Sequence, residues 1–155
     1  MDLPFIDELQ TDARAAAGTV FLEVAGRIGR SFEGGGARVF SWLLGCVHRG
    51  VSFTVPPVTG QEASGFRVAK VDVPSELVLE GQHRFAIYRL SFFIDVLDDN
   101  TCRVRARTDA AFPGIKGAAY RALVIGSGAH AIVVRRMLSA IARRAERHAG
   151  DGSAK

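Results

Sequence analysis

The residue of this sequence that is best placed to do chemistry is His130. It falls on the apolar side of a helix that a 3.6-residue periodicity predicts over residues 128–148. An imidazole changes its charge near neutral pH, so at such a position it can orient the polar group of a bound molecule or transfer a proton. It can equally form a structural hydrogen bond to a nearby hydroxyl, such as that of Tyr88 or Thr108. The sequence leaves these alternatives open.

Other reactive side chains lack the context that their chemistry needs. Ser91 and Ser127 are the candidate nucleophiles by position, but neither lies in a nucleophile-elbow sequence. The four histidines are scattered, with no cysteine or carboxylate at metal-ligand spacing, and we expect His83 to be exposed beside a turn. The glycine run at 34–36 is not followed by the Lys-Ser/Thr pair of a phosphate loop. We therefore expect no metal and no cofactor.

Length and composition are those of one globular domain. The chain has 155 residues, of which 48% are hydrophobic and 23% charged. No apolar run approaches the ~18 residues that cross a bilayer, and the acidic N-terminus differs from a secretory signal. Cys46 and Cys102 lie in apolar stretches, where we expect buried reduced thiols. These features predict a cytoplasmic protein with a single domain over 1–149 and a disordered tail over 150–155.

The net charge of +4 is concentrated at the C-terminus. From Arg135 onward there are six basic and two acidic residues, and this excess equals that of the whole chain. A separate row of arginines, Arg103, Arg105 and Arg107, should form a solvated outer sheet face, with binding of an acidic partner as the alternative. Because no aromatic residues are interleaved in this row, we expect no nucleic-acid binding.

A long β-hairpin is the element that should lie opposite the terminal helix. Residues 83–97 and 101–112 alternate apolar and polar side chains, which predicts two strands with one apolar face each. If residues 98–100 form the loop, Leu97 faces Thr101 and the apolar side chains pair. The expected apolar pairs are Val96 with Cys102, Ile94 with Val104, and Phe92 with Ala106. On the other face the same register sets Asp95 opposite Arg103 and Arg89 opposite Asp109, and these charge pairs should support it.

Shorter elements complete the chain. The patterns predict a strand at 5–9, a helix at 13–26 capped by Thr11 or Asp12, a mostly covered helix at 37–49, strands at 66–73 and 76–80, and a short helix or irregular segment at 116–125. The apolar face of the terminal helix should consist of Val133, Val134, Met137, Leu138, Ile141 and Ala145. Its outward side should carry Arg135, Arg136, Ser139, Arg143, Glu146 and Arg147.

This order of elements resembles the START-like helix-grip superfamily, also called the polyketide cyclase and pollen-allergen superfamily (SRPBCC). The resemblance rests on the strand from Gly81 to Ser91, the segment from Gly117 to Tyr120, and His130 ahead of Val133, Arg135 and Leu138. The resemblance is strongest to a bacterial branch of this superfamily. It implies no catalytic residues for this chain. It implies an α+β fold, in which a curved antiparallel sheet wraps around a long C-terminal helix and two shorter helices lie near the N-terminus. The run 126–128 departs from the expected sequence before the helix.

The resemblance also implies a cavity between sheet and helix that binds a hydrophobic small molecule, lipid-like or polyketide-like. The candidate pocket residues are Tyr88, Leu90, Phe92, Val104, Thr108, His130, Val134, Met137 and Ile141. One alternative is an enzyme of the cyclase or dehydratase type that uses the same cavity, with His130 and Tyr88 as acid/base groups. Another is a protein-interaction module that docks through the basic C-terminal helix.

Overall fold

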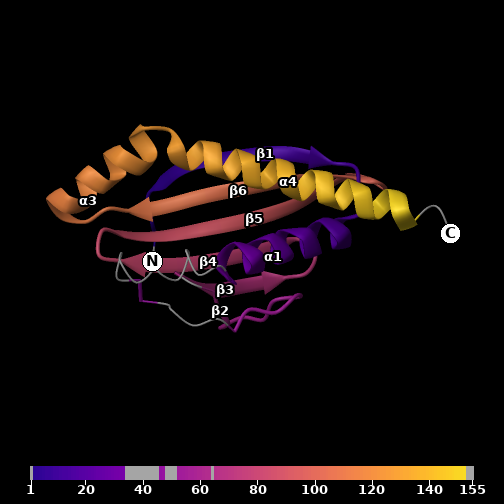
Figure 1. The fold of residues 1–155 in the computed structure, drawn as a ribbon, viewed down its shortest axis with the longest axis horizontal. Coiled ribbons are helices and arrows are strands. Elements are labelled where there is room, and N and C mark those ends of the chain that lie inside the picture. Colours follow the sequence, from indigo (N-terminus) through magenta and orange to yellow (C-terminus); the bar gives the residue numbers. More distant parts are fainter. Residues whose placement is uncertain (1, 34–45, 48–51, 64, 153–155) are drawn as a thin grey trace.

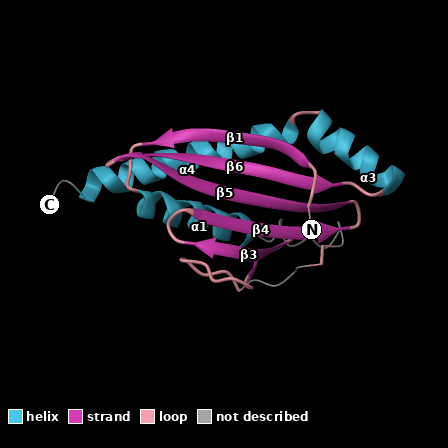
Figure 2. Ribbon diagram, turned by 180° about the vertical axis from the view of Figure 1, so that it is seen from behind, coloured by secondary structure: helices cyan, strands magenta, loops and turns pink. Residues whose placement is uncertain are grey.

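A computed structural model describes residues 2–33, 46–47, 52–63 and 65–152. Six strands form one antiparallel sheet in the order β1-β6-β5-β4-β3-β2, and helices α1 and α4 lie on the same face of it (Figures 1 and 2). The elements are β1 (Phe5–Ala13), α1 (Ala17–Glu33), β2 (Glu62–Ala63), β3 (Phe66–Asp72), β4 (Glu76–His83), β5 (Ala86–Asp98), β6 (Thr101–Ala111), α3 (Gly114–Arg121), η1 (Ala122–Gly126) and α4 (Ala129–Gly152).

This architecture confirms the expected α+β helix-grip class, with a curved antiparallel sheet packed against a long C-terminal helix. Of the two expected N-terminal helices, α1 is described. The helix expected at 37–49 lies outside the described residues, apart from 46 and 47.

The first strand and the first helix both extend further than the sequence predicted. Thr11 and Asp12, which were expected to cap a helix, instead continue β1 along β6. The helix therefore begins at Ala17 and runs to Glu33. Pairing with a long neighbouring strand has outweighed the local capping preference of these two residues. The buried stripe of α1 consists of Val20, Phe21, Val24 and Ile28.

The register of the β5–β6 hairpin is confirmed, and its turn is tighter than expected. All three predicted apolar pairs form. Asp98, rather than Leu97, lies opposite Thr101, because a bulge at Leu97 absorbs the extra residue. The backbone N–H of Asn100 donates to the side chain of Asp98 at 2.9 Å, which closes the turn.

On the outer face, the predicted charged residues lie opposite one another, but the ion pairs that form have other partners. They are Arg89 with Glu80 at 2.7 Å, Arg103 with Asp12 at 2.8 Å, Arg105 with Asp95 at 2.6 Å, and Arg107 with Asp109 at 2.9 Å. Arg89 and Arg103 pair with the residues directly opposite them on their other neighbouring strands, β4 and β1. Arg105 reaches a diagonal neighbour on β5, and Arg107 pairs two residues along its own strand. The arginine row is thus largely neutralised by carboxylates, which disfavours the alternative of an acidic partner at this face.

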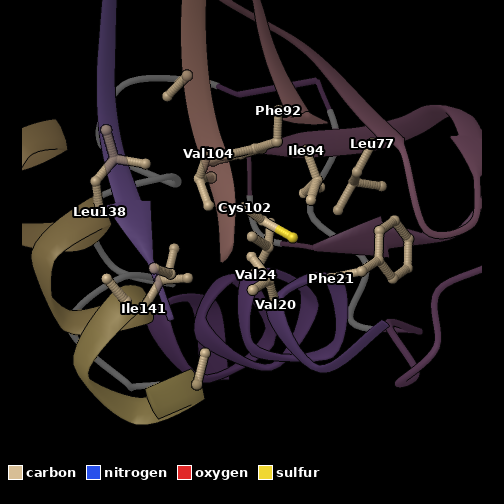
Figure 3. Close-up of a cluster of buried hydrophobic side chains, with 14 of the residues drawn as sticks. Val20, Phe21, Val24, Leu77, Phe92, Ile94, Cys102, Val104, Leu138 and Ile141 are labelled. Carbon is tan, nitrogen blue, oxygen red and sulfur yellow. The ribbon is translucent and has the colours of Figure 1, made fainter. Parts of the chain in front are cut away.

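The hydrophobic core lies between the inner face of the sheet and the two helices (Figure 3). The sheet contributes Leu77, Phe92, Ile94 and Val104, and α1 contributes Phe21 from the other side. Leu138 and Ile141 of α4 close it. Cys46 and Cys102 are both buried free thiols, as the sequence predicted.

Helix α4 presents its arginines to solvent as expected, but one residue of its predicted apolar face does not pack. The six predicted outward residues are all exposed. Val133 is 64% exposed, because at about 100° per residue it lies about 120° from the centre of the buried stripe. The helix continues to Gly152, past the expected start of the tail at residue 150. The hydroxyl of Ser127 accepts a hydrogen bond from the backbone N–H of Ala129, the first residue of the helix.

Residues 116–125, for which a short helix or an irregular segment was expected, belong to α3 and to a single π-helical turn, η1. In the described part of the chain, no helix alone is both long and apolar enough to cross a bilayer. The segment Gly114–Gly126 and the helix up to Asp151 meet that requirement only together, across a bend of 48°.

Candidate ligand site

Three polar side chains from three elements meet under the first turn of α4. The Nε2 atom of His130 lies 2.9 Å from the hydroxyl of Thr108 on β6 and 3.6 Å from Oδ1 of Asp7 on β1. Asp7 and Thr108 lie directly opposite each other in the β1–β6 ladder, so both project from the same face of the sheet toward the helix. Of the two hydroxyls that the sequence suggested as possible partners of His130, Tyr88 and Thr108, it is that of Thr108 that lies within hydrogen-bonding distance. We call Asp7, Thr108 and His130 the polar cluster.

One oxygen of the polar cluster faces the ring of His130 without accepting a hydrogen bond within the described part of the chain. Oδ1 of Asp7 is buried and accepts no hydrogen bond from the residues that the structure describes. A buried acceptor in this state costs on the order of 1–3 kcal/mol of stability. A water or a bound molecule that donates a hydrogen bond to this oxygen would remove the cost. The cluster is therefore suited to accept a hydrogen bond from a ligand.

Sequence reasoning missed Asp7. The residue stands in an acidic N-terminal stretch that reads as a solvated surface. The alternation of Asp7, Leu9, Thr11 and Ala13 along one face of β1 was the available signal, and it required knowing that the strand continues to Ala13.

An apolar surface adjoins the polar cluster on the next strand. Leu90 of β5 lies opposite Thr108 and on the same face as Phe92. Phe92 is fully buried, whereas Leu90 keeps partial exposure although β4 and β6 flank its strand. Met137, two turns beyond His130 on the same side of α4, is also only partly buried. Solvent thus reaches the inner face of the sheet close to the polar cluster.

The nine predicted pocket residues fall into three groups. Four of them belong to the packed core, with exposed fractions of 0–3%: Phe92, Val104, Val134 and Ile141. Thr108 is 6% exposed and bonds His130. The other four keep partial exposure: Tyr88, Leu90, His130 and Met137. The structure brings Leu90, Thr108 and His130 together, and it assigns Tyr88 to a separate neighbouring cluster.

That neighbouring cluster is aromatic and joins α3 to the β4–β5 turn. The ring of Tyr88 lies 5.0 Å from that of Phe66 and 5.5 Å from that of His83, and Tyr120 of α3 lies 5.0 Å from His83. The hydroxyl of Tyr88 donates to the carbonyl of Gly65 at 2.7 Å. Burial raises the pKa of Tyr88 far above its usual value, so the phenol stays protonated and is a poor general base.

His83 is buried, with 8% of its surface exposed, which corrects the prediction that it faces solvent. The turn beside it is covered by Tyr120 of α3, and the local sequence does not reveal this contact between segments. The backbone N–H of Phe85 donates to its Nδ1 atom at 3.1 Å, which favours a neutral ring protonated at Nε2.

The burial of His83 should make stability depend on pH. Burial lowers the pKa of His83 below the usual 6.5, so the unfolded chain takes up a proton at a higher pH than the folded one. The contribution of neutral His83 to stability is complete at pH values above its pKa in the unfolded chain. It is lost as the pH falls from there toward its lower pKa in the folded chain. We expect the free energy of unfolding, measured with urea between about pH 8 and pH 5, to fall less steeply in His83→Gln than in the wild type. Equal slopes would contradict this assignment.

Among the described residues there is no group of three or more histidine, cysteine or acidic side chains that could hold a metal ion.

Comparisons with known proteins bear on the fold. No family model matches the sequence, and no curated protein matches it either. A START superfamily protein from Mycobacterium smegmatis is 12% identical with a TM-score of 0.56, over 90% of this chain and 98% of that one. Norcoclaurine synthase from Thalictrum flavum is 12% identical with a TM-score of 0.51, over 92% and 86% of the two chains.

CalU16 from Micromonospora echinospora is 9% identical with a TM-score of 0.51, over 94% of this chain and 83% of that one. At such identities the likeness concerns the backbone alone. Together with the sheet order and the long terminal helix, it establishes that this chain has the START-like helix-grip fold.

Proposed function

We propose that this protein binds a hydrophobic small molecule between α4 and the inner face of its sheet, over Leu90. The observation that carries the proposal is the junction of a partly exposed apolar surface with a buried carboxylate oxygen that accepts no hydrogen bond from the described residues. Ligand sites in proteins combine an apolar lining with a few polar groups that fix orientation. Leu90 and Met137 supply the lining, and the polar cluster supplies the orienting group.

The polar cluster narrows the chemistry of the ligand. The carboxylate form of Asp7 accepts hydrogen bonds and donates none, so the group that it would select on a ligand is a donor, such as a hydroxyl or an amine. We therefore propose a lipid-like or polyketide-like molecule with an apolar body and one donor group. Norcoclaurine synthase from Thalictrum flavum has been solved with dopamine and hydroxybenzaldehyde, which supports a small aromatic ligand for this fold.

Titration with the apolar dye N-phenyl-1-naphthylamine tests the site. We expect the wild type to bind the dye saturably, and the Leu90→Trp variant to bind it at least about tenfold more weakly, because the indole fills the proposed site. Val96→Trp is the matched control, since Val96 lies on the same face of β5 but is 66% exposed at its far end. If both variants bind the dye as the wild type does, the proposed site is wrong.

Replacing Asp7, whose buried oxygen accepts no hydrogen bond from the described residues, should change both the stability of the protein and its ligand preference. In Asp7→Leu the buried acceptor is removed at nearly constant shape, so the ligand-free protein should gain about 1 kcal/mol in its free energy of unfolding. The same change should abolish any preference for 1-naphthol, which can donate a hydrogen bond, over 1-methoxynaphthalene, which cannot. The measurements are urea denaturation and competition against the dye.

Asp12→Leu is the control for this change. Asp12 stands on the same strand but on the outer face, where it accepts from Arg103 at 2.8 Å. Its replacement should bring no gain in stability and leave the preference for naphthol intact. A stability gain equal to that of Asp7→Leu would show that the effect does not come from the polar cluster.

A second candidate function is acid/base catalysis in the same place. It is favoured by the 3.6 Å separation between His130 and the carboxylate of Asp7, which places an imidazole and a carboxylate side by side under the first turn of α4. Tyr88 is a weaker partner for His130 than the sequence suggested, because its hydroxyl already donates to a backbone carbonyl. For an enzyme of the cyclase or dehydratase type, His130→Phe should abolish turnover while the fold persists by circular dichroism. Turnover that survives this change would exclude His130 as the acid/base group.

A further inference from the structure

An apolar arch stands at one end of the molecule. It consists of α3, η1 and the first turn and a half of α4, and it lies along the end of the sheet where β6 finishes (Figures 1 and 2). Only Gly117 of α3 is buried, and no residue of η1 is. The arch nevertheless carries large apolar side chains in solvent, with exposed fractions of 90% for Ile115, 70% for Leu123, 52% for Ile132 and 64% for Val133.

The inner side of the arch is anchored. Tyr120 stacks on Phe85 with ring centroids 5.8 Å apart, and a Cβ added at Gly117 would lie 2.6 Å from the backbone of Phe112. At the start of α4, His130 faces Thr108. Ile132 follows His130 by about 200° of rotation, so it points away from the sheet. The exposed apolar side chains are therefore held outward by a fixed support.

Charge on the arch has one sign. The sequence contains no acidic residue between Asp109 and Glu146. The basic residues of the arch and the turn that follows it are all exposed: Lys116, Arg121, Arg135 and Arg136. On the outer face of the sheet, by contrast, Arg103, Arg105 and Arg107 are each paired with a carboxylate. Segments that lie in the interface of an anionic membrane have this composition, in which exposed apolar side chains are flanked by basic residues.

We propose that the arch docks on an anionic lipid bilayer. Ile115, Leu123 and Ile132 enter the boundary between headgroups and acyl chains, and the basic residues contact lipid phosphates. The helices lie on the bilayer and do not cross it, because α4 is fixed to the core through Val134 and Leu138. This inference is independent of ligand binding, since none of these residues belongs to the proposed ligand site.

Flotation with lipid vesicles tests the proposal. The wild type should float with vesicles of mixed phosphatidylcholine and phosphatidylglycerol, and much less with pure phosphatidylcholine or at high salt. The double variants Leu123→Glu/Ile132→Glu and Lys116→Glu/Arg121→Glu should each reduce binding at least about tenfold. The control is Arg143→Glu/Arg147→Glu, which reverses two exposed arginines at the far end of α4 and should bind nearly as the wild type does.

Three results would overturn the proposal: no flotation of the wild type, arch variants that bind unchanged, or a control that loses binding to the same extent. A wild type that is dimeric by light scattering, with arch variants that are monomeric and no binding to vesicles in either, would assign the arch to a second copy of the chain instead. Circular dichroism of each variant establishes that it is folded.

Discussion

Replacing Phe92 by alanine is expected to lower the free energy of unfolding by about 3–5 kcal/mol. Phe92 is fully buried and lies between Leu77 and Ala106 on the neighbouring strands, under the two helices (Figure 3). Truncation removes the ring from the centre of the core and leaves a cavity that the rigid sheet cannot close. Such a loss is a large share of the ~5–15 kcal/mol that stabilises a typical domain. Denaturation with urea at constant m-value measures it.

Phe93→Ala is the matched control. Phe93 is the next residue of the same strand, so its side chain lies on the outer face, where its ring is only partly buried under the guanidinium of Arg105 at 4.9 Å. Its truncation should cost clearly less than that of Phe92, because it leaves no internal cavity. Equal losses in the two variants would contradict the assignment of the inner face.

The second large effect is expected at Gly81. A Cβ atom added there would lie 2.3 Å from the carbonyl oxygen of Gly65 and 2.3 Å from the ring of Tyr88. Neither group can move away freely, because the hydroxyl of Tyr88 donates to that same carbonyl. We expect Gly81→Ala to lower the free energy of unfolding by about 1–3 kcal/mol and to change the near-ultraviolet circular dichroism of the aromatic cluster.

Gly18→Ala is the control for this substitution. Gly18 is an exposed residue of α1, and an added Cβ would meet nothing within 4 Å. Because alanine has the higher helix propensity, this variant should be as stable as the wild type or more stable by up to about 1 kcal/mol. A tolerated alanine at Gly81 would mean that the close packing against Tyr88 is absent in solution.

The hairpin and the terminal helix could be predicted from the sequence because their signals are local and long. Strict alternation over β5 and β6 admits one register, since a shift by one residue would expose every apolar side chain. The same argument placed Thr108 on the inner face, and helical periodicity placed His130 opposite it. The two periodicities made Thr108 one of the two hydroxyls expected near His130, and the structure shows which of them it contacts.

The remaining parts of the site depend on contacts between distant segments. Asp7 joins the polar cluster only because β1 pairs with β6 across some hundred residues of sequence, and no local pattern announces that pairing. His83 is buried because Tyr120 packs on it from α3. Val133 is exposed because the sheet supports one narrow stripe of α4. In each case contacts between distant segments determine whether the side chain is buried or exposed. Local propensity and periodicity carry no information about such contacts.

Native mass spectrometry of protein purified from cells tests whether a hydrophobic molecule binds between α4 and the sheet over Leu90. The wild type and Val96→Trp should each carry one additional small apolar mass per chain, and Leu90→Trp should carry none. An identical complement of bound mass in Leu90→Trp and the wild type would contradict binding at this site, as would a wild type that carries no such mass.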